Sequence, residues 1–289
     1  MRYGSTARSF IAALSLTLAT TSAGAQSPDP APVPITIGAT HSVRLGDGEE
    51  RREVNVHLPA DYARGGRYPV LYVVDGGLSQ DFFQVAAASA LNASLERSLP
   101  VIVVGVQTVN RRADLIGEPG GEEERRLFPT AGQAQRFRTF LRERVKPMIE
   151  ATYRTTGDDA VVGESLAGLF IAETWLTEPA LFDRYAAINP SLWWHDARLS
   201  RSAAGVLADG VARGPLLLSA SNEGPITTAA VRSLAAAAGE RACYVDASHL
   251  THATTYHTLM PQVLQFLFPT SKRFDANYGF TVGCSRPAR

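Results

Sequence analysis

Ser165 lies in a segment whose residue types suit a catalytic nucleophile. Residues 160–170 read AVVGESLAGLF, so an apolar strand ends at Val162, a tight turn carries Ser165, and a helix-forming run begins at Leu166. A serine at such a junction projects its hydroxyl at the carboxyl edge of a parallel sheet, where a base reaches it and the first helical amides bind an oxyanion. We therefore predict Ser165 as the nucleophile and the Leu166 amide as an oxyanion donor.

The pattern around this serine is G-x-S-x-G with one departure. Gly163 and Gly168 are present, but Ala167 stands where the second glycine of the pattern is usual. Strand and helix nearly touch at such a turn, so the flanking side chains must be small. Alanine meets that demand, and we expect the departure to be tolerated.

A serine hydroxyl needs a base to accept its proton, and a histidine oriented by a carboxylate supplies one. In hydrolases with this junction the chain order is serine, acid, histidine, each after a successive strand. His252, in the loop after the last predicted strand, is the predicted base, and His249 is the alternative. Glu223, at the carboxyl end of the predicted strand 215–219, is the predicted acid, and Asp246 is the alternative.

An oxyanion site needs a second backbone donor besides Leu166. The predicted strand 69–74 is followed by Asp75-Gly76-Gly77. Glycines let a backbone approach a substrate closely, although they also occur in ordinary turns. We predict Gly76 as the second donor, with Gly77 as the weaker candidate.

Apolar β-rich runs alternate with helical patterns along the chain. The nearly continuous apolar runs are typical of strands buried on both faces. The predicted strands are 35–38, 54–58, 69–74, 101–106, 160–162, 185–188, 215–219 and 242–245, and the predicted helices are 79–95, 132–152, 166–177, 198–209, 226–239 and 255–268, with a polar loop over 107–130. This alternation predicts one α/β domain over 35–289, with a mostly parallel sheet covered on both faces.

The N-terminus has the pattern of a cleaved export signal. Arg2 and Arg8 precede an apolar stretch at 10–19, and AGA at 23–25 is a small-residue cleavage site. We predict a signal peptide over 1–25, a Pro-rich leader over 26–34 and a periplasmic or secreted protein. The apolar stretch is too short for a membrane span.

The charge of the chain is balanced. Loss of the two signal-peptide arginines reduces the 28 basic residues to 26, against 28 acidic residues. This balance argues against nucleic acid or an anionic membrane as a partner. The two cysteines, Cys243 and Cys284, either form one disulfide in an oxidising compartment or remain separate thiols. No CxxC, HExxH or histidine cluster with metal spacing is present, so we expect neither a metal nor another cofactor.

Several segments together resemble the putative-esterase family of α/β-hydrolases, which holds enterochelin esterases, IroE-like siderophore hydrolases and esterase D. The segments are LYVVDG (71–76), VVGVQTVNRRADL (103–115), VKPMIEATYRT (145–155), VVGESLAGLF (161–170), INPSLWW (188–194) and LTHATTY (250–256). The resemblance implies the α/β-hydrolase fold, with Ser165 as nucleophile, His252 as base and Glu223 as acid. Some siderophore esterases of the family manage with a serine–histidine pair.

Two further residues lie in segments that resemble borders of the family's active site. Arg112 would neutralise an anionic substrate group or pair with Asp114. Trp194 would pack an acyl or aryl group or fill the gap beside the serine turn.

We therefore expect an exported serine esterase that hydrolyses small-molecule carboxylic esters through an acyl-enzyme, with siderophore lactones among the candidate substrates. The alternatives are an acyltransferase that uses the same acyl-enzyme and a non-catalytic ligand-binding homologue. The sequence leaves the substrate and the oligomeric state open.

Overall fold

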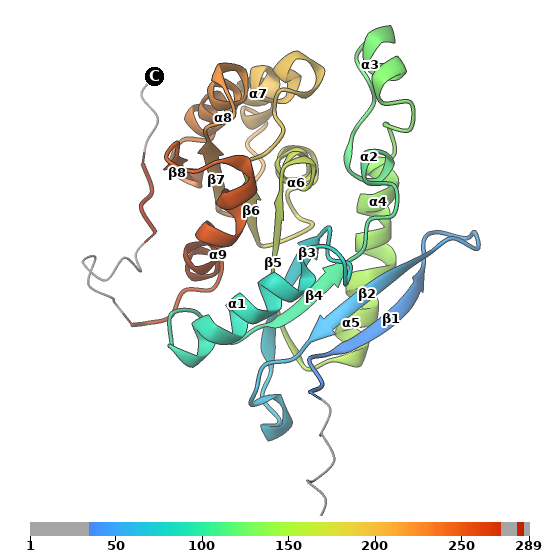
Figure 1. The fold of residues 1–289 in the computed structure, drawn as a ribbon, viewed down its shortest axis with the longest axis vertical. Coiled ribbons are helices and arrows are strands. Elements are labelled where there is room, and N and C mark those ends of the chain that lie inside the picture. Colours follow the sequence, from blue (N-terminus) through green and yellow to red (C-terminus); the bar gives the residue numbers. More distant parts are fainter. Residues whose placement is uncertain (1–34, 273–281, 286–289) are drawn as a thin grey trace, which may run out of the picture. The chain divides into compact units, whose positions relative to one another are not determined.

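Eight strands of the described chain form one sheet (Figure 1), in the order β1-β2-β4-β3-β5-β6-β7-β8. The structure, a computed structural model, describes residues 35–272 and 282–285, so the predicted signal peptide and leader lie outside the described residues. The strands are β1 (Ala39–Arg44), β2 (Arg51–His57), β3 (Tyr68–Val74), β4 (Ile102–Val106), β5 (Thr155–Glu164), β6 (Arg184–Ile188), β7 (Leu216–Ser221) and β8 (Ala242–Ala247). β1 pairs antiparallel with β2, and β2 with β4, whereas every later pairing is parallel.

Helices cover both faces of this sheet. They are α1 (Phe82–Ser94), α2 (Arg111–Leu115), α3 (Glu122–Leu127), α4 (Ala134–Phe140), α5 (Lys146–Thr152), α6 (Leu166–Thr177), α7 (Trp194–Leu207), α8 (Pro225–Ala238) and α9 (His252–Leu267). α1 and α9 pack on one face, where Leu71 and Val73 of β3 point, and α4 to α8 pack on the other, with Val70 and Tyr72. Because successive side chains of a strand alternate between faces, the continuous apolar run of β3 contributes side chains to the hydrophobic cores on both faces of the sheet. The predicted α/β class with a mostly parallel sheet is confirmed.

Most expected elements are present with shifted ends, and three of the differences have a clear physical cause or add an element. The first strand is β1 at Ala39–Arg44 rather than 35–38, because pairing with β2 sets its position and Ile35 is 90% exposed. The expected loop 107–130 contains the short helices α2 and α3. The expected helix 132–152 is interrupted by a π-helical turn at Leu141–Val145, just before Pro147, whose missing N–H breaks the regular hydrogen-bond ladder.

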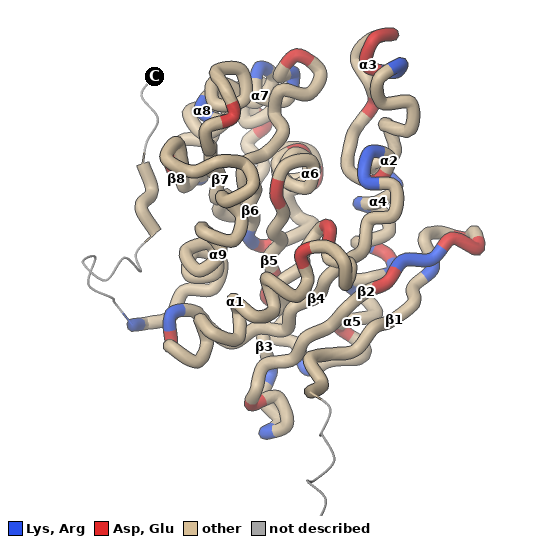
Figure 2. The backbone as a smooth tube through the Cα atoms, in the orientation of Figure 1, with Lys and Arg blue, Asp and Glu red and all other residues tan. Residues whose placement is uncertain are grey.

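Acidic and basic residues are interspersed along the described chain, and basic residues occur together at α2 (Figure 2). Residues 37–289 belong to one contact-defined unit. Within residues 35–272 no helix has both the length and the apolarity that crossing a membrane requires. The predicted domain boundary at residue 35 stays a prediction.

A disulfide joins β8 to the C-terminal segment. Cys243 of β8 is bonded to Cys284, with their Cα atoms 4.8 Å apart, and the neighbouring residues Tyr244 and Ser285 form an antiparallel bridge. Of the two alternatives left open by the sequence, the bonded pair is the one present. This bond fixes the described residues 282–285 beside the last strand of the sheet.

Loss of this disulfide is expected to destabilise the protein. The bond closes a loop with a sequence separation of 41, for which the chain-entropy model gives roughly 4 kcal/mol of stabilisation. Urea unfolding of the wild type with and without dithiothreitol, and of Cys284→Ser, measures the effect. The reduced wild type and the variant should unfold at the same lower midpoint, and a wild-type midpoint that reductant leaves unchanged would contradict this expectation.

Candidate active site

Ser165 occupies a strained turn between β5 and α6. Its backbone has φ 60° and ψ −117°, a region that residues other than glycine rarely adopt. The turn is held from both sides: Ser165 N–H donates to the Ile188 carbonyl at 3.1 Å, and the Ser165 carbonyl accepts from Ser191 N–H at 3.0 Å. A strained serine directly between a strand and a helix is the geometry of a nucleophile elbow, which holds the hydroxyl exposed.

The side chains beside this elbow must be small. A Cβ added to Gly163 would lie 2.7 Å from the Ala167 Cβ, and one added to Gly168 would lie 3.0 Å from the Ile188 carbonyl oxygen and the Pro190 Cα. Ala167 is itself fully buried. The alanine that departs from the motif therefore fits, because the facing residue is a glycine.

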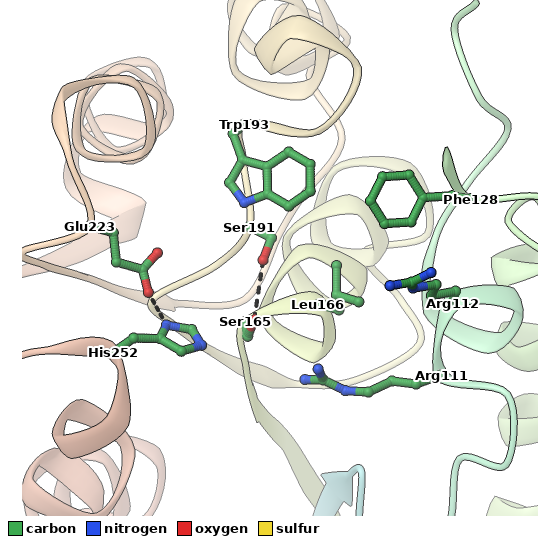
Figure 3. Close-up of a pocket in the computed structure, with 9 residues that line it drawn as sticks. All are labelled: Arg111, Arg112, Phe128, Ser165, Leu166, Ser191, Trp193, Glu223 and His252. Atoms are coloured by element: carbon green, nitrogen blue, oxygen red, sulfur yellow. Dashed lines mark hydrogen bonds and ion pairs between the residues drawn. The ribbon is translucent and has the colours of Figure 1, made fainter. Parts of the chain in front are cut away.

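His252 and Glu223 meet at the carboxyl edge of the sheet. Figure 3 shows the Glu223 Oε1 atom in direct contact with His252 Nδ1, while the other ring nitrogen lies on the side that faces Ser165. His252 is not in the loop, as the sequence suggested, but is the first residue of α9. Thr251 ends the loop and caps that helix through reciprocal hydrogen bonds with Thr254. This cap sets the first residue of α9 and therefore the position of the His252 side chain.

The serine and the histidine line the same pocket, which has a volume of about 420 Å³. Ser165 Oγ lies 3.2 Å from Ser191 Oγ, and among the described residues it makes no direct hydrogen bond to His252. Catalytic hydrogen bonds often tighten only when substrate is bound. The nine residues that line the pocket are Arg111, Arg112, Phe128, Ser165, Leu166, Ser191, Trp193, Glu223 and His252.

The alternative base and acid lie elsewhere. Asp246 accepts a hydrogen bond from Ser248 N–H at 2.9 Å and lies 3.6 Å from Arg232. Together with His249 it lines a different cavity, of about 260 Å³. The structure thus brings Glu223 and His252 to Ser165 and leaves His249 and Asp246 apart.

The prediction that Gly76 supplies an oxyanion donor is wrong. Its single N–H donates to the Val106 carbonyl at 2.9 Å within the sheet, so it is already used. The residue must be glycine for another reason: an added Cβ would lie 2.3 Å from the Gly105 Cα on β4. The next amide, Gly77 N–H, donates to the Gln80 side-chain oxygen at 2.8 Å, and the Gln80 Nε2 atom donates to the Thr108 carbonyl and Oγ1, each at 3.0 Å. Leu166, by contrast, is the first residue of α6 and lines the pocket, and its amide stays the predicted oxyanion donor.

The tryptophan that lines the serine pocket is Trp193, whereas Trp194 has the packing role that the sequence left open as one of its two alternatives. Trp194 is 6% exposed, packs edge-on against Phe128 with ring centroids 5.1 Å apart, and lines a separate cavity with Leu169. Trp193 lines the serine pocket and is 38% exposed. Two adjacent tryptophans point in different directions, and the sequence does not reveal which one faces the site.

Two arginines from α2 reach the same pocket. Arg112 lies over the Phe128 ring, 4.8 Å from its centroid. Arg111, which sequence analysis missed although it adjoins Arg112, donates from Nε to Asp75 Oδ2 at 2.5 Å and from Nη2 to the Glu164 carbonyl at 3.3 Å. Its guanidinium is thus fixed beside the elbow, where Figure 3 shows it pointing toward Ser165.

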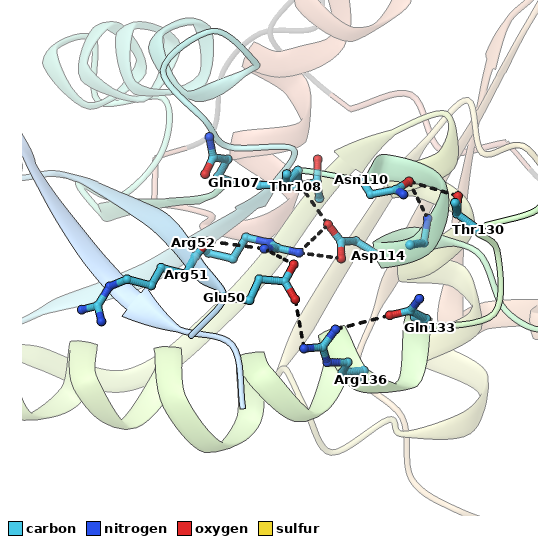
Figure 4. A network of polar contacts seen from close by, with 12 residues as sticks. Glu50, Arg51, Arg52, Gln107, Thr108, Asn110, Asp114, Thr130, Gln133 and Arg136 are labelled. Carbon is cyan, nitrogen blue, oxygen red and sulfur yellow. Dashed lines mark hydrogen bonds and ion pairs between the residues drawn. The ribbon is translucent and has the colours of Figure 1, made fainter. Parts of the chain in front are cut away.

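A buried ion pair holds α2 in position. Asp114 does not pair with Arg112 but accepts from Arg52 Nη2 at 3.0 Å, and both side chains are under 10% exposed. Figure 4 shows how Glu50 extends this contact, because it bonds Arg52 at 2.6 Å and Arg136 at 3.0 Å. The network joins β2, α2 and α4, so the position of the two pocket arginines depends on the antiparallel part of the sheet.

Burial shifts the pKa of several groups near the serine. Burial and then the Arg111 guanidinium lower the pKa of His252, while the touching Glu223 carboxylate acts in the opposite direction. Burial and the Asp81 charge raise the pKa of Glu164 to about 7. Burial and the Asp75 charge raise the pKa of Asp81 to about 6. The imidazole is therefore favoured in its neutral, proton-accepting form, and a poorly solvated carboxyl group lies directly before the nucleophile.

The strand order and the strained serine at the β5–α6 junction are those of the α/β-hydrolase fold. Within residues 35–272 and 282–285 no group of three or more His, Cys, Asp or Glu side chains is arranged to hold a metal ion. The family model described as "Putative esterase" matches residues 47–244. The chain belongs to this family.

Curated relatives carry siderophore esterase names. Ferri-bacillibactin esterase BesA of Bacillus subtilis is 26% identical over 182 residues, which covers 55% of this chain and 61% of that protein. The apo-salmochelin esterase of Escherichia coli O6:H1 is 31% identical over 172 residues, covering 55% of this chain and 52% of that protein. The chain thus matches between about half and three fifths of the length of these two relatives.

Solved structures share the fold over most of their length. The BES protein from Bacillus cereus has a TM-score of 0.72 at 19% identity and covers 85% of this chain and 100% of its own. The IroE-like serine hydrolase from Shewanella oneidensis has a TM-score of 0.67 at 23% identity and covers 80% of each chain.

Replacing Glu164 by glutamine is expected to stabilise the protein above neutral pH. The folded-state pKa of about 7 lies above the ordinary glutamate value of 4.5, so the folded state holds the proton more tightly and stability falls as pH rises between these values. Glu164→Gln should raise the melting temperature by roughly 2–6 °C at pH 8, with a smaller gain at pH 5. The exposed Glu143→Gln serves as the matched control. An identical gain for Glu164→Gln at both pH values would argue against the raised pKa.

Proposed function

We propose that this chain is a serine esterase that cleaves carboxylic esters through an acyl-enzyme. One observation supports this most strongly: three distant segments bring Ser165, Glu223 and His252 to one pocket, with the serine in a strained elbow. A fold alone would not support an activity. The names of the relatives agree with this reaction class.

Acylation begins when Ser165 Oγ attacks the ester carbonyl and His252 Nε2 takes the hydroxyl proton. Glu223 accepts a hydrogen bond from Nδ1–H and stabilises the imidazolium that forms. The Leu166 amide donates to the oxyanion, and Gly77 is the proposed second donor once Gln80 moves away. His252 then protonates the departing alcohol.

Deacylation repeats these roles with water. His252 takes a proton from water as its oxygen attacks the acyl carbonyl, and then returns that proton to Ser165 as the C–O bond to the enzyme breaks. The products are the carboxylic acid and the free enzyme.

The side chains around the serine indicate the substrate class. Phe128 and Trp193 offer aromatic surface, and Arg111 and Arg112 offer positive charge. We propose an aromatic, negatively charged ester as the substrate, and within this class a siderophore lactone fits the relatives' names.

We also propose that the protein acts after export. The residues at 1–25 have the pattern of a signal peptide. The bond between Cys243 and Cys284 is of the kind that persists in oxidising compartments.

Replacing Ser165 by alanine is expected to abolish turnover. Because the variant lacks the attacking oxygen, kcat for p-nitrophenyl acetate should fall by a factor of about 10³ or more. Labelling by a fluorophosphonate should be lost as well. Ser94→Ala, on the exposed side of α1, is the matched control and should keep wild-type rates. Labelling that persists in Ser165→Ala would identify a different nucleophile and contradict the proposal.

Replacing Arg112 by glutamine is expected to lower kcat/KM for anionic esters more than for uncharged esters. Loss of one charge-assisted contact should lower kcat/KM about tenfold for an aryl ester that bears a carboxylate. The uncharged analogue of the same ester should change by less than about twofold, since its contacts involve no ion. Arg126→Gln in α3, which does not line the pocket, is the control. Equal losses for both substrates would contradict the charge role.

A further inference from the structure

Asn189 is a buried polar residue at the carboxyl end of β6, and neither the motif around the serine nor the order of serine, acid and base calls for it. Its side chain is fully buried, and its backbone has φ 47°. Asparagine tolerates this left-handed conformation better than most residues. Its N–H donates to Ser219 Oγ at 3.1 Å, which fixes the start of the turn.

The side chain of Asn189 reaches both members of the acid–base pair. Its Nδ2 atom lies 2.6 Å from Glu223 Oε1, 2.9 Å from His252 Nδ1 and 2.7 Å from Ser221 Oγ. Its Oδ1 atom accepts from Ser221 N–H at 2.9 Å, which fixes which end of the amide carries the nitrogen.

The number of amide hydrogens limits which of these three contacts are hydrogen bonds. The amide has two hydrogens but three neighbours. Glu223 Oε1 touches His252 Nδ1, so Nδ1 carries a hydrogen that it donates to the carboxylate. An Nδ1 that carries a hydrogen cannot accept another, so the two amide hydrogens go to Ser221 Oγ and Glu223 Oε1. The only ring nitrogen left with a lone pair is then Nε2, on the side of Ser165.

We propose that Asn189 is a positioning residue that holds the Glu223 carboxylate ionised and aligned, and thereby keeps His252 in the tautomer whose Nε2 accepts the Ser165 proton. The inference rests on the proposed serine esterase function and extends it. Asn189 does not line the pocket, and its side chain contacts Glu223, His252 and Ser221.

The charged groups around the imidazole determine whether loss of the Asn189 hydrogen bond raises or lowers the pKa of His252. The charged groups that face His252 are Glu223, from the segment between β7 and α8, and Arg111, from α2. The hydrogen bond from Asn189 Nδ2 stabilises the negative charge of Glu223. Without it, the carboxylate attracts the imidazolium proton more strongly, so the pKa of His252 rises.

The test compares Asn189→Ala and Asn189→Asp with the wild type in the full protein. Asn189→Asp keeps the shape and the oxygen that accepts from Ser221 N–H, so the test does not depend on the alanine variant folding. NMR titration of the histidine Cε1–H signals gives the pKa of His252, which is assigned with His252→Ala. We expect a rise of about 0.5 unit or more in Asn189→Ala and about one unit or more in Asn189→Asp, where a second carboxyl group lies beside Glu223.

Kinetics provide the second readout. The acid limb of the pH profile of kcat/KM for p-nitrophenyl acetate should move to higher pH by the same amounts, and kcat at pH 7 should fall roughly tenfold or more with KM within about twofold. Asn92→Ala is the matched control, since this buried asparagine bonds the Pro261 carbonyl far from the pocket. It should lower the melting temperature without moving the acid limb.

A His252 pKa that stays within about 0.2 unit of the wild-type value in folded Asn189→Asp would overturn the inference. A wild-type protein that turns over no ester and resists fluorophosphonate would overturn the proposed function instead. In that case the NMR titration still decides whether Asn189 controls the imidazole.

Discussion

The close approach of β5 and α6 at Ser165 is the constraint on which the site depends. No residue other than Ser165 separates the strand from the helix, so the turn requires a backbone conformation that costs of the order of 1–3 kcal/mol. That cost is offset by packing, because α6 buries Phe170, Ile171 and Trp175 almost completely beneath the sheet. The strain persists because the helix cannot shift without losing this contact, and the hydroxyl is held at one point of the sheet edge.

The parallel half of the sheet brings the remaining groups to that point. Four neighbouring strands, β5 to β8, run in the same direction, so the segments that follow them emerge at one edge. From these segments come Ser165, Ser191, Glu223 and His252, in the order of the strands. The antiparallel part of the sheet, which contains β1 and β2, positions a different group of side chains. Through the buried pair of Arg52 and Asp114, it holds the short helix that carries the positive charge of the pocket.

Sequence reasoning relied on the position of each residue along the chain. Strand alternation predicted the fold, and the expectation that serine, acid and base follow successive strands led to Ser165, Glu223 and His252, which the structure brings to one pocket. It failed for Gly76, because the glycine pattern does not reveal that this N–H is bonded within the sheet. A glycine required by close packing and one required by a ligand look the same in a sequence.

The other differences concern side-chain direction. Trp193 and Trp194 are adjacent, and the three residues after them, 195–197, have left-handed backbone conformations that no helical periodicity predicts. The sequence does not point to Asn189, because its side-chain contacts are with residues more than 30 positions away. Arg111 likewise acquires its orientation from Asp75 and from the Glu164 carbonyl, which lie 36 and 53 positions away in the chain.

The C-terminal segment has a consequence beyond the stability of the monomer. β8 is the last strand of the sheet, and its outer edge would otherwise present unpaired backbone groups that can recruit a strand from another molecule. Ser285 pairs with Tyr244 on this edge, and the bond between Cys243 and Cys284 keeps it there. The disulfide therefore holds Ser285 against the outer edge of β8, and reduction of this bond would free the Tyr244 backbone on that edge to pair with a strand of a second molecule.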